Sequence, residues 1–238
     1  MKTFYLILLF ALVTIETYTQ VHFTKYKPAK YKTVAIQGGS LLADSTLFDV
    51  IDLNKIPTLD GIKIYLKHIK DDSSVMLIYK KSKLVQTIAF PFWFWLIEND
   101  CFVADLDNNK KADIKLTIEG GGSGLAGELA HKIYLFNYGS KFKVLTFFDY
   151  SHEKEYDLNN DGVFEILSCN HVFNGGHSYW VYNAFNFVNG RLKNVSKMLG
   201  YPLWTKHLNN SSNIVATNIS KKDRIKEYRG LPENVIIK

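Results

Sequence analysis

Two acidic loops carry the residues whose types and spacing could do chemistry. In the second loop, oxygen-bearing side chains stand at positions 1, 3, 5 and 9, which are Asp157, Asn159, Asp161 and Glu165. Calcium prefers about six to eight oxygen ligands, and alternate residues of a tight loop can all point inward. Gly162 at position 6 accepts the positive φ that closes such a turn, and Val163 at position 7 adds a main-chain carbonyl oxygen.

The first loop repeats this spacing and starts 52 residues earlier. Its corresponding side chains are Asp105, Asp107, Asn109 and Asp113, with the carbonyl of Lys111 at position 7. Lys110 replaces the glycine, and it adds positive charge together with Lys111. The spacing therefore predicts calcium in both loops, with the second loop as the stronger site.

Two other interpretations of the loops remain. An EF-hand requires a bidentate Glu at position 12 and flanking helices, but position 12 is Leu116 in the first loop and Ser168 in the second. The residues after the first loop alternate between apolar and polar, which is typical of a strand. A plain turn between strands is the simpler alternative, because Asp and Asn favour turns without any metal.

The elements around the loops recur along the chain. Residues 101–148 and 157–199 each contain an acidic loop, a strand, a glycine turn, an aromatic strand and a closing basic strand. A degraded copy over about 45–99 has Asp52, Asn54 and Asp60 at loop positions 1, 3 and 9. Together with abundant aromatic and β-branched residues, this pattern predicts an all-β fold of repeated antiparallel units. Stacking buries faces that single repeats leave exposed.

The N-terminus is typical of an exported protein. Lys2 precedes an apolar run from Phe4 to Ile15, which indicates a signal peptide over residues 1–19. An uncleaved anchor is the alternative; if the signal is cleaved, we expect no stable membrane span. Residues 20–205 then form the repeat β-domain, and 206–238 form a basic C-terminal tail with a short helix. We expect a secreted, periplasmic or cell-surface location.

The net charge of +6 is compatible with an anionic partner, but the lysines are scattered and no aromatic–basic nucleic-acid motif occurs. We therefore expect no nucleic-acid binding. Cys101 and Cys169 lie beside the acidic loops. They either form a disulfide or remain two buried thiols. The run from Phe90 to Trp95 is either a core strand or a platform for sugar rings.

Catalytic patterns are incomplete. Ser123 has a glycine two residues before it but Leu125 two residues after it, so it does not form a nucleophile elbow. His171 and His177 could hold zinc with Glu165, although their spacing is not diagnostic. The sequence therefore predicts a protein that is not an enzyme.

The acidic loops resemble the FG-GAP/VCBS-type repeats of exported bacterial proteins. Asp157 to Ile166 match the repeat's calcium-loop motif fully, and Asp105 to Ile114 match it except at Asn109 and Lys110. The resemblance implies calcium loops that join the blades of a small or incomplete β-propeller-like fold. A weaker likeness, in residues 77–88 and the acidic loops, is to small periplasmic proteins related to lysozyme inhibitors.

These features predict an exported, calcium-stabilised β-repeat protein with a binding or structural role. Its partner would be an unknown protein or polysaccharide ligand. One alternative is a periplasmic inhibitor of a cell-wall-degrading enzyme, and a second is a hydrolase on a propeller-like scaffold.

Overall fold

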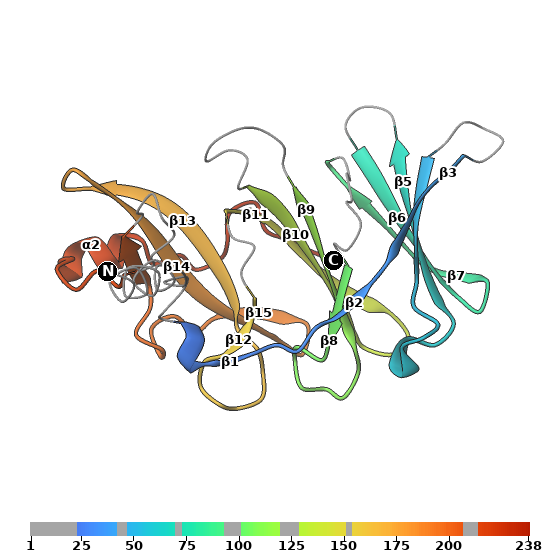
Figure 1. The fold of residues 1–238 in the computed structure, drawn as a ribbon, viewed down its shortest axis with the longest axis horizontal. Coiled ribbons are helices and arrows are strands. Elements are labelled where there is room, and N and C mark those ends of the chain that lie inside the picture. Colours follow the sequence, from blue (N-terminus) through green and yellow to red (C-terminus); the bar gives the residue numbers. More distant parts are fainter. Residues whose placement is uncertain are drawn as a thin grey trace, which may run out of the picture.

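The protein folds as antiparallel β-sheets with little helix. The computed structural model describes residues 23–41, 47–69, 73–92, 101–119, 129–150, 154–206 and 214–238. Strands make up 55% and helices 6% of the structure, which confirms the prediction of an all-β fold. Three larger sheets follow one another along the long axis of the molecule, and no sheet closes on itself (Figure 1).

The first sheet has the strand order β3-β4-β5-β6-β7. Its strands are Ile36–Leu41, Leu47–Asp52, Ile62–Ile69, Ser73–Lys80 and Lys83–Phe90. The short helix η2, Pro57–Leu59, lies between β4 and β5. Side chains alternate between buried and half-buried along most of β6, as expected for a strand with one face on the core.

The middle sheet has the order β17-β11-β10-β9-β8-β2. Its strands, in chain order, are Lys32–Val34, Cys101–Ala104, Asp113–Glu119, Ala130–Asn137, Phe142–Asp149 and Ile236–Ile237. In the third sheet, β14 (His177–Val188) pairs with β13 (Ile166–Asn174), β15 (Arg191–Asn194) and β16 (Leu203–Lys206). One large sheet thus overlaps each of the three predicted units.

The N-terminal part of the described chain, residues 23–34, is called the strap here. It contains η1 (Phe23–Lys25), β1 (Lys27–Pro28) and β2. β1 pairs with β12 (Tyr156–Asp157), β2 pairs with β8, and the chain then enters β3 of the first sheet. The strap therefore links the segment before the third sheet to the middle and first sheets (Figure 1).

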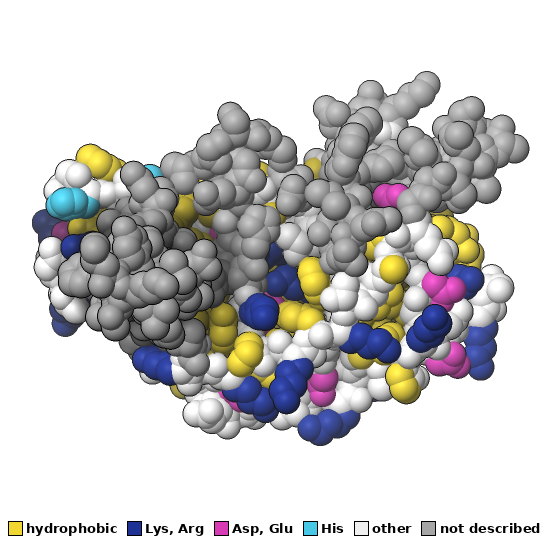
Figure 2. Space-filling view, viewed as in Figure 1, with side chains coloured by type: hydrophobic (Ala, Val, Ile, Leu, Met, Phe, Trp, Pro, Cys, Tyr) yellow, Lys and Arg dark blue, Asp and Glu magenta, His cyan; other side chains and the backbone are white. Residues whose placement is uncertain are grey.

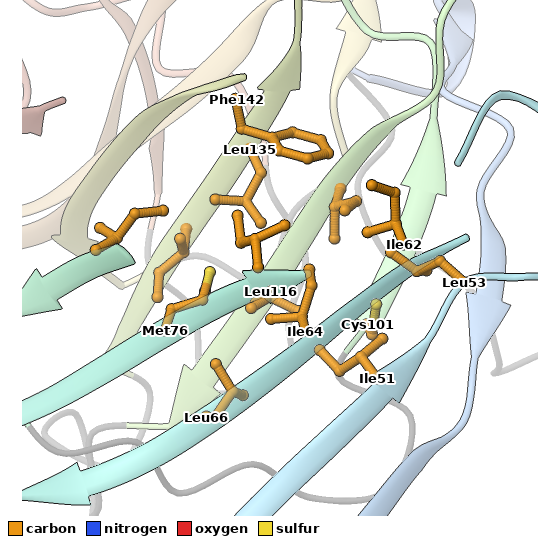
Figure 3. Close-up of a cluster of buried hydrophobic side chains, with 14 of the residues drawn as sticks. Ile51, Leu53, Ile62, Ile64, Leu66, Met76, Cys101, Leu116, Leu135 and Phe142 are labelled. Atoms are coloured by element: carbon orange, nitrogen blue, oxygen red, sulfur yellow. The ribbon is translucent and has the colours of Figure 1, made fainter. Parts of the chain in front are cut away.

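The core is divided between the two faces of the middle sheet. On one face, Leu116 and Leu135 point toward Ile64 and Met76 of the first sheet (Figure 3). On the other face, Phe136 stacks on Phe187 of the third sheet at 4.2 Å between ring centroids. Because both faces are covered, β9 and β10 are almost continuously buried.

The tail does not lie apart from the sheets. Strand β17 extends the middle sheet through β11, and α2 covers Lys221–Lys226, with Ser220 accepting the N-cap bond from the Asp223 amide. The main-chain carbonyl of Glu227 accepts a hydrogen bond from Asn183 of β14. The described part of the predicted tail, 214–238, therefore contains the expected short helix and is hydrogen-bonded to two sheets.

Several other sequence predictions meet the structure here. Cys101 and Cys169 are both free and buried, and they lie in different apolar clusters, so they are thiols and not a disulfide. The predicted signal peptide, residues 1–19, lies outside the described residues. Within the described ranges, no helix is long and apolar enough to cross a membrane.

Candidate metal centre

The two acidic loops share one backbone conformation. Position 4 has a positive φ in both, 59° at Asn108 and 63° at Asn160. Position 6 also has a positive φ, 67° at Lys110 and 85° at Gly162. The missing glycine therefore does not change the path of the first loop, although the lysine side chain is strained there.

In the first loop, three carboxylates are gathered. One oxygen from each of Asp105, Asp107 and Asp113 lies within 4.8 Å of the others. Asp113 is buried, and its two oxygens accept from the amides of Leu106 and Asn137, both at 2.8 Å. Asp107 also accepts a hydrogen bond from the hydroxyl of Tyr138. These bonds hold the loop between β8 and β9.

The side chain of Asn109 turns its amide nitrogen, not its oxygen, toward the carboxylate of Asp107. Its Nδ2 donates to Asp107 Oδ2 at 3.1 Å, while its Oδ1 accepts from the amide of Lys111 at 2.8 Å. The Lys111 side chain is exposed. The sequence predicts that the main-chain carbonyl of Lys111 is a calcium ligand. The described hydrogen bonds of the loop involve the amide of Lys111 and do not test this prediction.

In the second loop, two buried carboxylate oxygens lack hydrogen-bond partners among the described residues. They are Asp157 Oδ1 and Glu165 Oε1. Their second oxygens are bonded, since Asp157 Oδ2 accepts from the Gly162 amide at 3.2 Å and Glu165 Oε2 accepts from the Leu158 amide at 2.8 Å. A buried carboxylate oxygen is costly without a donor or cation, so a cation could satisfy these two atoms.

The remaining predicted ligands of the second loop are more exposed. Asn159 Oδ1 accepts from the amide of Asp161 at 3.0 Å, and Asp161 Oδ1 accepts from the amide of Val163 at 2.8 Å. Asn159 Nδ2 also donates to Asp161 Oδ2 at 2.9 Å. Unlike the first loop, the second does not bring three carboxylate oxygens within 4.8 Å of one another.

The two loops lie side by side, which the sequence did not predict. The amide of Phe164 donates to the carbonyl of Leu106 at 2.9 Å. A Cβ atom on Gly162 would lie 2.8 Å from Nδ2 of Asn108, so glycine lets the second loop approach the first. The described loops are therefore one paired structure between the middle and third sheets.

The same acids share an unfavourable charge environment. Burial raises the pKa of Asp113 to about 7, despite its two amide donors, and Asp107 and Asp105 raise it further. Burial likewise raises the pKa of Glu165 to about 7, with added repulsion from Asp161 and Asp157. A divalent cation would favour the ionised forms of both groups.

The degraded third loop has a different balance. Asp52 forms an ion pair with Lys63 at 3.2 Å and accepts from the amide of Asn54 at 3.0 Å. The pKa of Asp52 is lowered, chiefly by that amide bond. Ile56 occupies the position of a ligand and is buried in the core. Lys63 therefore neutralises Asp52, whereas no ion pair among the described residues neutralises a carboxylate of the other two loops.

The other candidate sites are not assembled. His171 lies on β13 with its ring edge against Trp180 at 5.3 Å between centroids, and it belongs to no group of three metal-ligating residues within the described chain. Phe90 is buried in the core, and Phe92 packs against the same core. Ser123 and the aromatic residues 93–95 lie outside the described residues.

Sequence reasoning missed a buried polar network on the middle sheet. Glu155 Oε1 lies 2.8 Å from Lys115 Nζ and accepts from the Tyr134 hydroxyl at 2.6 Å. Glu155 Oε2 accepts from the hydroxyl of Tyr31 in the strap. Burial would raise the pKa of Glu155, but Lys115 and the two tyrosines outweigh it and keep the pKa below the usual value.

We expect Lys110→Gly to stabilise the calcium-free protein by about 1 kcal/mol, because glycine adopts a positive φ without the strain of a side chain. The change also removes a positive charge from the first loop, so calcium affinity there should rise. Thermal unfolding in chelator and calcium titration measure the two effects. Lys141→Gly, at an exposed turn between β10 and β11, is the control. A destabilised Lys110→Gly variant would contradict the strain argument.

No family model matches this chain, and neither a curated protein nor a solved structure matches it.

Proposed function

We propose that this chain is an exported binding protein whose paired acidic loops hold calcium and fasten the middle sheet to the third. The observation that carries this proposal is the pair of buried, unpartnered oxygens of Asp157 and Glu165. They belong to a loop with the backbone turns and oxygen spacing that suit calcium. The role is structural at the loops, and the partner binds elsewhere on the sheets.

The arrangement of the loops supports a fastening role. The first loop connects β8 to β9 of the middle sheet, whereas the second connects β12 to β13 and leads into the third sheet. The bond from Phe164 to Leu106 joins the two connections directly. Calcium in either loop would therefore stabilise the contact between neighbouring sheets as well as its own turn.

A propeller-like arrangement of repeated units fits the same proposal. Strands β4–β7 form one four-stranded antiparallel meander, and β8–β11 form a second. In the third sheet, β16 pairs with β14 in place of extending the sheet beyond β15. We propose three blade-like units of an incomplete ring, with the strap and β17 covering the two edges of the middle unit.

Calcium should raise the stability of the purified protein. Sites of extracellular modules have dissociation constants of about 10⁻⁴ to 10⁻³ M. At about 1 mM calcium and a dissociation constant near 0.1 mM, each site contributes about 1.4 kcal/mol. We expect Asp157→Ala to remove most of the response to calcium and Asp105→Ala to remove less. Thermal unfolding with calcium and with chelator measures this response.

The control is Asp60→Ala, which removes an exposed carboxylate of the lysine-containing third loop and should leave the response to calcium intact. A wild-type melting temperature that chelator does not change would refute the calcium proposal. Equal losses from Asp157→Ala and Asp105→Ala would keep calcium but overturn the ranking of the second loop above the first.

One feature favours an inhibitor of a wall-degrading enzyme as a second candidate. The β13–β14 hairpin projects from the body of the molecule (Figure 1), and Phe173 near its tip is 71% exposed. Exposed aromatic residues on a projecting hairpin are suited to inserting into a cleft of a partner. Under this candidate the protein slows cell-wall hydrolysis by a muramidase, and Phe173→Ser abolishes the inhibition while leaving the fold intact.

A further inference from the structure

The region beneath the strap contains a pocket that the acidic loops do not use. It has a volume of about 610 Å³ and lies between the strap and strands β8 and β9. Small-ligand pockets usually measure about 300–1,000 Å³, so its size suits a short saccharide. We infer that this pocket binds an acidic saccharide, an inference that rests on the proposed binding role and gives that role a site and a ligand class.

The rim of the pocket is basic. Lys30 on the strap and Lys154 just before β12 both line it, and both are exposed. The strap has four lysines and no acidic residue between residues 25 and 32. Figure 2 shows Lys and Arg side chains gathered over the lower part of the face that the strap crosses. Neither lysine forms an ion pair within the described part of the chain, so a carboxylate or phosphate group entering the pocket meets positive charge.

The aromatic and hydroxyl-bearing residues that line the pocket are suited to a sugar. Tyr31 and Phe102 line it with an edge-to-face pair whose centroids are 5.7 Å apart. Aromatic faces can cover the apolar C–H face of a sugar ring. Thr33 and Thr117 also line the pocket, and threonine hydroxyls can exchange hydrogen bonds with those of a sugar.

Buried contacts hold the aromatic wall in position. The Tyr31 hydroxyl is bound by Glu155, and the ammonium group of Lys115 lies 5.5 Å from the centre of the Tyr31 ring. Lys115 is itself neutralised by Glu155 at 2.8 Å. The two exposed rim lysines therefore supply the positive charge that a ligand can reach, while Lys115 and Glu155 fix the shape. A site fixed before binding loses less conformational entropy when its ligand arrives.

Titration calorimetry with the full chain in calcium tests the inference. The probes are a short oligogalacturonate, a phosphorylated oligosaccharide, a neutral malto-oligosaccharide of the same length and a poly-glutamate peptide of the same charge. We expect an acidic saccharide to bind, more weakly as salt rises because exposed charges are screened. The first two probes distinguish carboxylate from phosphate as the recognised group.

The test variant is Lys30→Glu/Lys154→Glu, and the matched control is Lys83→Glu/Lys141→Glu, which changes the net charge equally at exposed positions outside the pocket. We expect the test variant to bind the acidic saccharide about tenfold more weakly, and the control to bind it as the wild type does. The inference is overturned if neither acidic saccharide binds, if the neutral saccharide or poly-glutamate binds equally well, or if the control loses as much affinity.

Failure of this inference is separable from failure of the calcium proposal. Both charge-reversal variants keep the acidic loops, so each should retain the wild-type change in melting temperature on adding chelator. A normal response to chelator without saccharide binding rejects the pocket alone. Saccharide binding without a response to chelator rejects the calcium loops alone.

Discussion

Lys115→Met should destabilise the folded protein by about 3–5 kcal/mol, because it leaves Glu155 charged, buried and without its cation. The ion pair is short, at 2.8 Å, and both side chains are almost fully buried. The two tyrosine hydroxyls that also bind Glu155 cannot replace a positive charge. Chemical denaturation of the wild type and the variant measures the loss.

The double variant Lys115→Met/Glu155→Leu separates charge from packing. Replacing both members of a buried ion pair by apolar residues is often far less damaging than removing one of them. We therefore expect the double variant to recover much of the lost stability. Lys141→Met, at an exposed turn, is the matched control and should have little effect. A single variant as stable as the control would show that Glu155 does not depend on Lys115.

The calcium-free protein should be less stable at pH 7.5 than at pH 5, by on the order of 2–4 kcal/mol from two groups. The folded-state pKa values of Asp113 and Glu165 are both raised to about 7. Between about pH 5 and pH 7, the folded state holds protons that the unfolded state has released. The stability from these two groups is therefore fully present below their unfolded pKa values and is lost as the pH rises through about 7.

Calcium should remove this loss, because a bound cation favours the ionised carboxylates. Thermal unfolding from pH 5 to pH 7.5, with chelator and with calcium, measures both curves. The variant Asp113→Asn/Glu165→Gln should flatten the curve in chelator, whereas Asp60→Asn should not. A calcium-free protein that becomes steadily more stable from pH 5 to pH 7.5 would show that other carboxylates dominate and that the loop acids are not protonated.

The pairing of the sheets explains why one segment matters to several sites. Glu155 accepts a hydrogen bond from the hydroxyl of Tyr31 in the strap, and Tyr156 pairs with Pro28 of β1. Asp157 is the first predicted ligand of the second loop. Three successive residues thus join the pocket, the strap and the calcium loop. This segment therefore links the proposed binding pocket to the proposed calcium loop.

The sequence by itself determined the local features. Alternation of apolar and polar residues along β9 predicted a strand, because side chains in a strand point to opposite faces in turn. The spacing of Asp157, Asn159, Asp161 and Glu165 identified a tight acidic loop through its turn chemistry. The sequence did not predict that Lys110 adopts the positive φ that glycine has in the second loop. The amide of Lys110 donates to Asp105, and this bond holds the lysine in that conformation.

Only the tertiary structure decided which distant groups meet. Glu155 belongs to no motif, and its partners Tyr31, Lys115 and Tyr134 come from the strap and two strands of the middle sheet. The contact between Phe164 and Leu106 and the separation of Cys101 from Cys169 also depend on how whole sheets pack. Periodicity reports which face of a strand is buried, but the partner on that face is set by burial and hydrogen bonding across the assembled sheets.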